Sequence, residues 1–452
     1  MPSTEFEQIV LAGADDHDLT KLSEYEQVGG YQSLRKALAM ERQAVLDELL
    51  AAGLRGRGGA GFPMGRKASF VPKPEQTTRP IYLTINADES EPGTFKDREI
   101  MQRVPHRLIE GALITAYTIG SNNVFIYIRG EYLAEFEIVQ AALAEARDRG
   151  LVGGNILGSG WNCTIVLHRG AGAYICGEET ALLESLEGKR GQPRSKPPFP
   201  ALQGLYASPT LINNVETIAT VPPIIAQGGA WYAQFGVPNS AGTRVFSLSG
   251  NVANGGNYEL PLGTSLRELI YDIGGGIPNG RTLKAIIPGG SSTPVLTADQ
   301  VDTTLDFDAI GAAGSMLGSG AIIAIDDRAC MVQLALRVAQ FYQHESCGKC
   351  TPCREGTRWM VNIIEKIETG HAQQGDLDLL LSVCDRILGK CLCPLGDAAA
   401  MPVASYVDRF REEFQAHIDQ GCCPFGDSSS LDSILSPVQQ HARLIRELAV
   451  IA

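Results

Sequence analysis

The chain has 452 residues, of which 44% are hydrophobic and 20% are charged, a balance typical of a globular protein with about three domains. The formal net charge of −13 argues against nucleic acid or an anionic lipid surface as the main partner, because both require a basic face. No apolar run approaches the roughly eighteen residues that a membrane span requires, and the acidic N-terminus does not resemble a signal or transit peptide. We therefore expect a cytoplasmic protein whose eleven cysteines stay reduced.

The first half of the chain predicts an arm, a helix and then alternating strands and helices. Residues up to about Glu26 are polar and acidic and predict a surface-hugging arm, and apolar residues at helical spacing predict one helix over 31–52. Strands are predicted at 81–86, 124–130 and 163–170, and helices at 132–150 and 178–188. This alternation predicts a mostly parallel sheet covered on both faces, with ligands bound beyond the carboxyl ends of its strands.

In the second half of the chain the predicted secondary structure changes twice, first to a small domain of strands and then to helices. A proline-rich stretch over 192–210 predicts a long loop, a type of segment that is usually functional. From about Gly242 a small domain of strands and one short helix is expected, with strands at 244–250, 256–263, 283–290 and 321–327. After Arg328 the pattern is helical to about Ile418, and a loop-like tail with a short amphipathic helix follows.

The stretch HESCGKCTPCREGT carries Cys347, Cys350 and Cys353 at a strict spacing of three. Three thiolates on one tight turn suit three corners of a [4Fe–4S] cluster, whereas a zinc site more often takes two Cys-x2-Cys pairs. Zinc and unligated reduced thiols remain the alternatives. The fourth ligand is Cys391 or Cys393 in KCLCPLGD, and Cys393 precedes a proline, as the last ligand of a ferredoxin set often does. Core packing is the expected role of most other cysteines, and the Cys422–Cys423 pair is assigned no role.

The glycine-rich stretch GLRGRGGAGFPMGRK covers 53–67. A backbone without side chains lets a ligand approach closely, and Arg57 and Lys67 add positive charge, so the loop suits a phosphate. It follows a helix rather than a strand and does not match the dinucleotide fingerprint. Phe62 and Phe70 are candidates to stack on a flat ring. The alternative interpretations are a flexible linker and two ordinary core residues.

Polar residues gather at the ends of the predicted strands. NADESEPG crowds Asp88, Glu89 and Glu91 together, which is unfavourable unless a ligand or a partner uses them. Such groups could hold the hydroxyls of a ribose or ribityl chain, and a solvated acidic turn is the alternative. Residues after the third predicted strand and on later loops are candidates for ligand contacts on the same grounds. They are Gly177, Glu178, Glu179, Lys196, Phe199, Asn213 and Asn214. Helix capping and interaction with a helix dipole are the alternative roles.

A nucleotide-type site and an iron–sulfur site in one chain together predict electron transfer. A nicotinamide gives two electrons as a hydride, whereas a cluster takes one electron at a time. A flavin can accept the pair and release its electrons singly, so the combination predicts a flavin between the other two.

Six motifs, in order and with near-uniform spacing from about Gly30 to Phe414, resemble a known family. GLRGRGGAGFP, NADESEPG, GAGAYICGEETAL, KPPFPA, NNVET and ESCGKCTPCREG together resemble the NADH-binding flavoprotein subunit of bacterial respiratory complex I (NADH-quinone oxidoreductase). The resemblance implies an α/β plus α fold. Its expected parts are an N-terminal arm and helix (1–52), a Rossmann-like FMN- and NADH-binding domain (53–240), a ubiquitin-like (SLBB, β-grasp) domain (241–327), and a helical [4Fe–4S] bundle with the C-terminal tail (328–452).

The resemblance also implies roles for individual residues. FMN is expected against Gly56, Arg57, Gly58, Gly59, Lys67, Asn86, Asp88, Glu89, Gly177, Glu178, Asn213, Asn214 and Thr217. The adenine of NADH is expected among Phe62, Phe70 and Phe199, and the rest of NADH at Lys196, Tyr174, Glu91 and Glu179. Ala68 stands where the family often has an aromatic residue, so part of the adenine packing differs. By resemblance the four cluster ligands are Cys347, Cys350, Cys353 and Cys393, and no residue is expected to act as an acid–base catalyst.

The implied activity is NADH dehydrogenation by hydride transfer to FMN, followed by single-electron transfer through a [4Fe–4S] cluster toward quinone. The implied partners are a thioredoxin-like [2Fe–2S] subunit and a large iron–sulfur subunit, in a complex at the cytoplasmic face of the inner membrane. The alternative is the diaphorase subunit of an NAD-reducing hydrogenase or formate dehydrogenase. Many of those carry an extra N-terminal domain with its own cysteines, and the absence of cysteine before Cys163 favours complex I. A zinc-stapled nucleotide-binding scaffold without redox activity is the alternative from another class.

Overall fold

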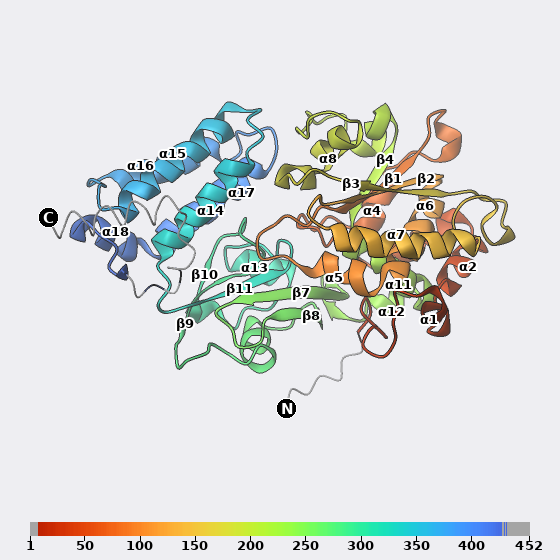
Figure 1. The fold of residues 1–452 in the computed structure, drawn as a ribbon, viewed down its shortest axis with the longest axis horizontal. Coiled ribbons are helices and arrows are strands. Elements are labelled where there is room, and N and C mark those ends of the chain that lie inside the picture. The colour runs from red at the N-terminus through yellow and green to blue at the C-terminus, as the bar shows by residue number, and fades with distance from the viewer. Residues whose placement is uncertain (1–7, 427–428, 430, 432–452) are drawn as a thin grey trace.

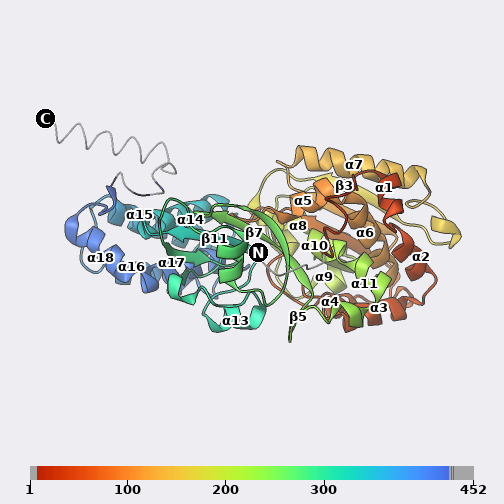
Figure 2. The ribbon, with the colours of Figure 1, turned by 90° about the horizontal axis from the view of Figure 1, so that it is seen from below.

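The computed structural model describes residues 8–426, 429 and 431, which form three packed units (Figures 1 and 2). The first unit is built on a parallel sheet and lies at one end of the molecule. A five-stranded sheet lies in the middle, and the helices α14–α18 lie at the other end. The short helix predicted in the C-terminal tail falls outside the described residues.

Four parallel strands form the sheet of the first unit in the order β3-β2-β1-β4. Their bounds are β1 Tyr82–Ala87, β2 Asn123–Ile128, β3 Thr164–Arg169 and β4 Thr210–Asn214. The first three strands confirm the predicted ones. The fourth was not predicted, because LINN is short and ends in two polar residues.

Helices cover both faces of this sheet, as the alternating pattern predicts. Leu83 and Ile126 belong to one buried cluster with α6 (Pro105–Ile119), and Tyr127 and Ile212 belong to another with α8 (Glu179–Leu186). The other helices of the unit are α1 Leu22–Gln27, α2 Gln32–Leu38, α3 Arg42–Ala51, α4 Met64–Ser69, α5 Lys96–Arg103, α7 Leu133–Asp148, α9 Pro200–Gln203, α10 Val215–Ala219, α11 Val221–Gln227 and α12 Gly229–Tyr232.

One prediction for the N-terminal region is wrong. The single helix over 31–52 is two helices, α2 and α3, and the Tyr117 hydroxyl donates to the Met40 carbonyl (2.9 Å) in the break between them. The segment predicted as a surface-hugging arm packs tightly against the protein, and Ile9, Val10 and Leu11 are buried. The Glu259 carboxylate, from the second unit, accepts hydrogen bonds from the three amides of these residues at 2.8–3.0 Å.

The second unit is a mixed sheet in the order β10-β9-β11-β7-β8, and the four strands predicted there are present. Its elements are β7 Thr243–Gly250, β8 Gly256–Pro261, the π-helix η5 Glu268–Ile273, β9 Leu283–Ile287, β10 Leu296–Thr297, α13 Phe307–Ala312 and β11 Ala321–Asp326. A two-residue pair, β5 Gly236–Val237 with β6 Ser240–Ala241, joins the first unit to the second.

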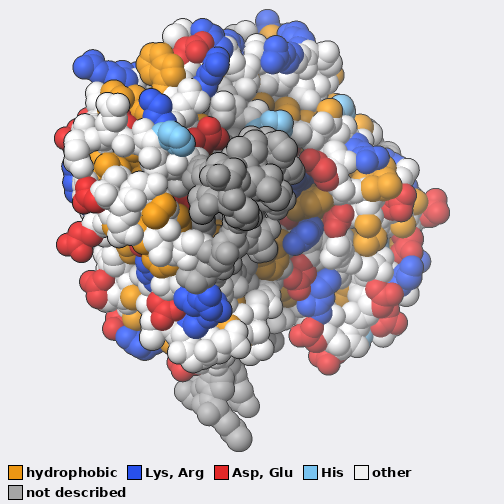
Figure 3. All heavy atoms as spheres, turned by 60° about the vertical axis from the view of Figure 1, so that its left-hand side comes forward, with side chains coloured by type: hydrophobic (Ala, Val, Ile, Leu, Met, Phe, Trp, Pro, Cys, Tyr) orange, Lys and Arg blue, Asp and Glu red, His pale blue; other side chains and the backbone are white. Residues whose placement is uncertain are grey.

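The third unit is helical, as predicted: α14 Met331–Glu345, α15 Thr351–Glu368, α16 Asp376–Ile387, α17 Leu395–Arg409 and α18 Arg411–Gln420. Apolar residues of α15, such as Met360, Ile364 and Ile367, are buried against neighbouring helices, and its basic residues Arg354, Arg358 and Lys366 are exposed. Acidic and basic side chains are interspersed over the face in Figure 3. Among the helices of the described residues, none is long and apolar enough to cross a membrane.

Candidate functional site

A cavity of about 780 Å³ opens where the three units meet. This volume lies in the range of small-molecule and cofactor sites, which is about 300–1,000 Å³. Eleven of the residues singled out in the sequence line it: Arg57, Gly58, Gly59, Asn86, Asp88, Glu89, Glu91, Tyr174, Gly177, Glu178 and Asn214. They come from the glycine-rich loop and from the carboxyl ends of β1, β3 and β4, where the parallel sheet predicts a site.

The glycine-rich loop presents bare backbone to this cavity. A Cβ on Gly58 would lie 3.1 Å from the Asn214 Cβ, and Gly59 has a φ of +133°, a conformation that favours glycine, with open space where a Cβ would lie. The Arg57 amide donates to Thr217 Oγ1 (2.9 Å), which fixes the loop on α10. Any larger residue at Gly58 would therefore press on Asn214, which lines the cavity.

The Arg57 side chain is held by the protein rather than extended to solvent. It is fully buried, and its Nη2 donates to the Tyr232 hydroxyl (3.0 Å) and the Thr243 carbonyl (2.7 Å). Its Nε and Nη1 are buried and have no hydrogen-bond partner among the described residues, and the same is true of Asn213 Nδ2. These unpaired donors fit a ligand that carries acceptor oxygens.

The acidic loop after β1 is buried rather than solvated. Asp88 is 2% exposed, and burial raises its pKa to about 7, against smaller lowering effects of the Ser90 hydroxyl and Arg129. Glu89 accepts from the amides of Asp97 and Arg98 at the start of α5. Glu91 accepts from the Tyr174 hydroxyl (2.8 Å) and the Ser292 amide (2.7 Å). Two of the three carboxylates thus hold the cavity wall together.

Asn86, Asp88 and Gly177 lie together at the strand ends. The Asn86 side-chain amide donates to the Gly177 carbonyl (2.8 Å), and a Cβ on Gly177 would lie 3.2 Å from Asp88 Oδ2. Glycine at 177 therefore keeps this part of the cavity open.

A buried charge network under the cavity was not predicted from the sequence. Lys96 Nζ lies 2.7 Å from Asp97 Oδ1 and 2.8 Å from Glu216 Oε2, and Asn214 Nδ2 donates to Asp97 Oδ2 (2.6 Å). The run TFKDRE after the acidic loop could have indicated this network, because charged residues at the start of a buried helix need hydrogen-bond or ion-pair partners.

A second group of predicted residues forms ion pairs beside the cavity without lining it. Glu179 Oε2 lies 2.9 Å from Lys67 Nζ, and Glu179 Oε1 lies 2.7 Å from Lys196 Nζ. Lys196 also reaches Glu178 Oε1 (3.1 Å). Burial alone would raise the pKa of Glu179, but the charges of Lys67 and Lys196 outweigh it and lower this pKa to about 2.

The three candidate stacking residues lie at the surface. Phe62 and Phe70 are 43% and 50% exposed, and their ring centroids are 6.1 Å apart. Phe199 is 58% exposed, and no ring contact joins it to that pair in the part of the chain that the structure describes. None of the three lines the cavity, and neither does Gly56, Asn213 or Thr217, which lie behind its wall.

The cysteine loop joins α14 to α15. Cys347 and Cys350 lie in this loop and Cys353 lies in the first turn of α15, while Cys391 and Cys393 lie just before α17. Electrostatic interaction with the nearby Cys347 and Cys350 helps to raise the pKa of both Cys353 and Cys393, and interaction with Cys350 and Cys353 helps to raise the pKa of Cys391. Two candidate fourth thiols therefore lie beside the predicted triplet.

All five thiols are free, and burial raises the pKa of Cys353 to about 11 and that of Cys393 to about 12. Bound iron would displace these protons, because the thiolate is the ligand. The loop also rests on the proline-rich segment, since Gln192 Nε2 donates to the Cys347 carbonyl (3.0 Å) and Lys349 Nζ to the Pro193 carbonyl (2.5 Å). This donor set fits an iron–sulfur cluster.

The cavity and the cysteines adjoin each other. Pro394 and Leu395, which follow Cys393 directly, line the cavity. On α14, the Tyr342 hydroxyl lies 2.9 Å from Ser291 Oγ and 3.5 Å from Glu91 Oε1. A molecule in the cavity would therefore be separated from the cysteine cluster by only a thin layer of protein.

Several residues of the cavity wall were not predicted from the sequence. Ser292, Phe307, Asp308 and Ser319 line it from the second unit, and Asp397 and Met401 line it from the third. None of them belongs to a glycine-rich or acidic motif, and only the packing of the units brings them to the site.

Comparisons with known proteins agree with this arrangement. Residues 49–223 match the family described as "Nuo51 FMN-binding domain", residues 245–296 an "SLBB domain", and residues 333–417 the "NADH-ubiquinone oxidoreductase-F iron-sulfur binding region".

Similar curated proteins cover nearly the whole chain. An F subunit of NADH-quinone oxidoreductase from Rhizobium meliloti (strain 1021), the one numbered 2, is 54% identical over 93% of this chain and 100% of its own length. The F subunit of NADH-quinone oxidoreductase from Streptomyces coelicolor is 50% identical over 93% of both chains. A chain in the crystal structure of an NAD⁺-reducing [NiFe]-hydrogenase in the H₂-reduced state is similar with a TM-score of 0.77 and 34% identity, over 92% of this chain and 69% of that one.

Proposed function

The chain belongs to the family of NADH-quinone oxidoreductase F subunits, and we propose that its residues divide into an FMN- and NADH-binding cavity and an adjoining [4Fe–4S] site. The protein is an oxidoreductase, the NADH dehydrogenase subunit of NADH-quinone oxidoreductase, with FMN and a [4Fe–4S] cluster as cofactors and NADH as substrate. The NAD⁺-reducing hydrogenase, which supplies the alternative function, is the more distant neighbour at 34% identity.

The observation that carries the proposal is the shared boundary of the two sites. The cavity is lined by the predicted nucleotide-binding loops on one side and by the residues that follow Cys393 on the other. When bound, FMN accepts a hydride from NADH, and the iron–sulfur cluster carries electrons one at a time.

The chain's own residues position the reactants and exclude water. Gly58, Gly59 and Gly177 leave room for the flavin against the backbone. Arg57, whose Nε and Nη1 have no hydrogen-bond partner among the described residues, lines the cavity, and Asn86, Asp88 and Asn214 form its polar edge. Asn213 supports this wall from behind. Glu91 and Tyr174 hold the wall shared with the third unit. No side chain needs to take a proton from the nicotinamide, so these residues act by positioning and electrostatics.

The other assignments are part of the same proposal. Gly56 and Thr217 support the glycine-rich loop, Glu89 and Glu178 shape the flavin side, and Lys67, Lys196 and Glu179 contact NADH with Phe62, Phe70 and Phe199 around the adenine. Cys347, Cys350, Cys353 and Cys393 are the four cluster ligands, and Cys391 is not a ligand.

We assign the fold in finer detail as well. Residues 53–240 form a Rossmann-like domain after the N-terminal region 1–52, residues 241–327 form a ubiquitin-like β-grasp domain, and residues 328–452 comprise the helical bundle with the tail. The family matches at 49–223, 245–296 and 333–417 support these boundaries.

Membership of the complex implies other subunits. Their proposed identities are a thioredoxin-like [2Fe–2S] subunit and a large iron–sulfur subunit, in an assembly at the cytoplasmic face of the membrane. Such partners would take the single electrons onward from the third unit.

The variant Gly58→Val tests the flavin assignment. Its side chain would enter the space beside Asn214, so we expect acid-released FMN per chain to fall at least about tenfold while iron content stays unchanged. Gly154→Val is the matched control, because Gly154 lies in an exposed loop with no positive φ and with no atom nearer than 3.8 Å to the added Cβ. Equal FMN content in Gly58→Val and wild type would refute the assignment.

A further inference from the structure

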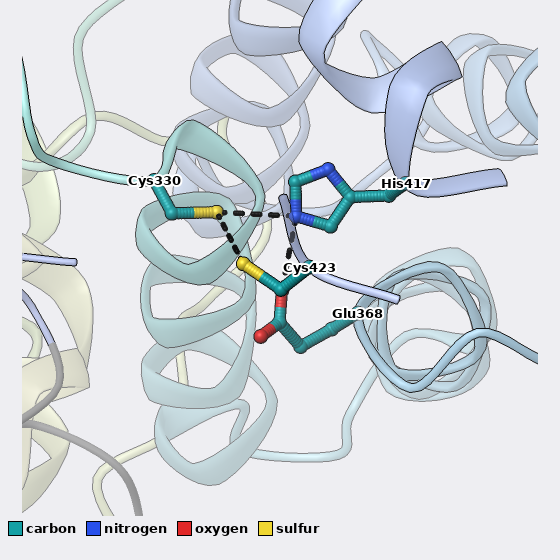
Figure 4. A group of neighbouring side chains, drawn as sticks. All are labelled: Cys330, Glu368, His417 and Cys423. Carbon is teal, nitrogen blue, oxygen red and sulfur yellow. Dashed lines mark hydrogen bonds and ion pairs between the residues drawn. The ribbon is translucent and has the colours of Figure 1, made fainter. Parts of the chain in front are cut away.

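A second set of possible metal ligands lies in the third unit, away from the cysteine loop. Cys330, Glu368, His417 and Cys423 each offer one ligand atom, and these four atoms lie within 4.8 Å of one another. Figure 4 shows the side chains converging from the start of α14, the end of α15, α18 and the turn after it. Cys330 and His417 are fully buried.

Three of the six separations between these atoms are close to those of a tetrahedral ligand shell. Cys330 Sγ lies 3.8 Å from Cys423 Sγ and 3.3 Å from His417 Nε2, and that nitrogen lies 3.5 Å from Glu368 Oε2. Metal–ligand distances of about 2.3 Å for sulfur and about 2.0–2.1 Å for nitrogen and oxygen place the corresponding atoms about 3.8, 3.5 and 3.4 Å apart around a tetrahedral zinc ion. A central ion therefore fits with little rearrangement.

The surrounding hydrogen bonds orient each ligand inward. His417 Nδ1 lies 2.7 Å from the Glu413 carbonyl, so it carries the proton and leaves the Nε2 lone pair facing the sulfurs. Glu368 Oε1 accepts from Gln333 Nε2 (3.0 Å), and Gln333 Oε1 accepts from the Ser429 hydroxyl (2.7 Å). Glu368 Oε2 is buried without a hydrogen bond among the described residues. A metal ion would satisfy it.

The backbone also favours a preformed site. Cys330 is the N-cap of α14, and its sulfur accepts a hydrogen bond from the Gln333 amide (3.5 Å), which fixes the sulfur at the start of the helix. Gly421 ends α18 with a φ of +65°, which turns the chain back toward His417. The segment after α18 presses on the turn after α15, since a Cβ on Gly370 would lie 1.8 Å from the Gly421 carbonyl oxygen.

This cluster is separate from the iron–sulfur cysteines. Cys353 and Glu368 stand near opposite ends of α15, and their separation of fifteen positions corresponds to about 22 Å along the helix axis. The Cys347–Cys353 loop and the second cluster therefore occupy opposite ends of the α14–α15 pair.

We propose that Cys330, Glu368, His417 and Cys423 bind one structural zinc ion, which ties the segment after α18 to the α14–α15 pair. Two thiolates, one imidazole and one carboxylate in a closed, buried, four-ligand shell favour zinc over magnesium, calcium or manganese. A shell without an open position assigns the ion a structural rather than a catalytic role.

The test measures zinc and iron per chain, by mass spectrometry of the elements, in the full-length protein purified with its iron–sulfur cluster after dialysis against dilute chelator. We expect about one zinc ion per chain in the wild type, and a loss of at least about tenfold in Cys423→Ser and in Glu368→Gln, with iron unchanged. Cys422→Ser is the matched control, because Cys422 is the exposed neighbour of Cys423 and lies outside the cluster. It should retain the zinc.

A second measurement does not depend on variants that fold poorly. Zinc K-edge absorption of the wild type should show two sulfur and two nitrogen or oxygen neighbours. The proposal is overturned by wild-type zinc below about 0.1 per chain after expression with added zinc, or by equal zinc in Cys423→Ser and wild type. Detection of a Cys330–Cys423 disulfide in the protein as isolated would also overturn it, because the two sulfurs would no longer be ligands.

Discussion

Replacing Glu179 by glutamine should relax the preference for NADH over NADPH. Lys67, Lys196, Glu178 and Glu179 form a cluster with two positive and two negative charges, and Glu179 contacts both lysines at 2.9 and 2.7 Å. The substitution changes the cluster's net charge from zero to +1. In the proposed NADH site, with Glu179 beside the ribose of the adenosine, the substitution would remove the repulsion of a 2′-phosphate and leave two lysines less neutralised.

The size of this effect follows from Coulomb's law for a 2′-phosphate placed beside the Glu179 carboxylate, and from the exposure of the Glu179 side chain. Two unit charges about 5 Å apart interact by about 3 kcal/mol at an effective dielectric constant of about 20. Since the Glu179 side chain is 25% exposed, solvent and salt reduce this value, and we expect about 1.4–2.8 kcal/mol. The ratio of kcat/KM for NADPH to that for NADH should therefore rise about 10- to 100-fold.

The assay is steady-state reduction of ferricyanide with NADH and with NADPH, on protein matched for FMN and iron content. Glu184→Gln is the control, because Glu184 lies on the same helix but pairs with Arg194 away from the large cavity. A ratio within about twofold of wild type in Glu179→Gln, or an equal rise in Glu184→Gln, would refute the reasoning.

Three further predictions concern the cluster, pH and stability. Cys393→Ser should lower iron and acid-labile sulfide per chain to below about half of wild type, whereas Cys391→Ser should not; the opposite result would exchange their roles. Because the pKa of Asp88 is raised from 3.8 to about 7 in the folded protein, its ionisation destabilises the fold progressively as pH rises from about 4 through 7. Asp88→Asn should therefore gain stability relative to wild type by about 2–3 kcal/mol between pH 5 and pH 8 in denaturant titrations, and a gap that does not change with pH would contradict this. Glu259→Ala should lower the free energy of unfolding by about 3–5 kcal/mol, because it leaves the amides of Ile9, Val10 and Leu11 unpaired, whereas the exposed Asp272→Ala should change it by less than about 0.5 kcal/mol; equal effects would refute the role of Glu259.

Local patterns in the sequence predicted those features of the fold and of the site that are determined by residues near one another in the chain. The apolar strands β1–β3, the helix α7 and the strands of the second unit follow from periodicity, and the glycine-rich and acidic loops were found from composition. Eleven of the residues singled out in the sequence line one cavity, some found from composition and others, such as Tyr174, only from the family resemblance. Composition was informative there because a parallel sheet brings its strand ends together.

Contacts between distant segments could not be predicted in this way. Ile9–Leu11 are buried because a carboxylate about 250 residues later accepts their amides, and nothing near them indicates it. The break between α2 and α3 depends on Tyr117. The second metal cluster takes its ligands from four separated positions with no motif spacing, so Cys330 was interpreted as an ordinary core residue and Cys423 was assigned no role.

The most direct test of the central claim is the cofactor content of the full chain, purified anaerobically with its companion subunits, and its response to NADH. We expect about one FMN per chain, about four iron atoms with matching acid-labile sulfide in the Cys347–Cys393 site, and an electron paramagnetic resonance signal of a reduced cluster after NADH is added. Protein that contains neither FMN nor iron with sulfide, and that gives no signal with NADH, would contradict it.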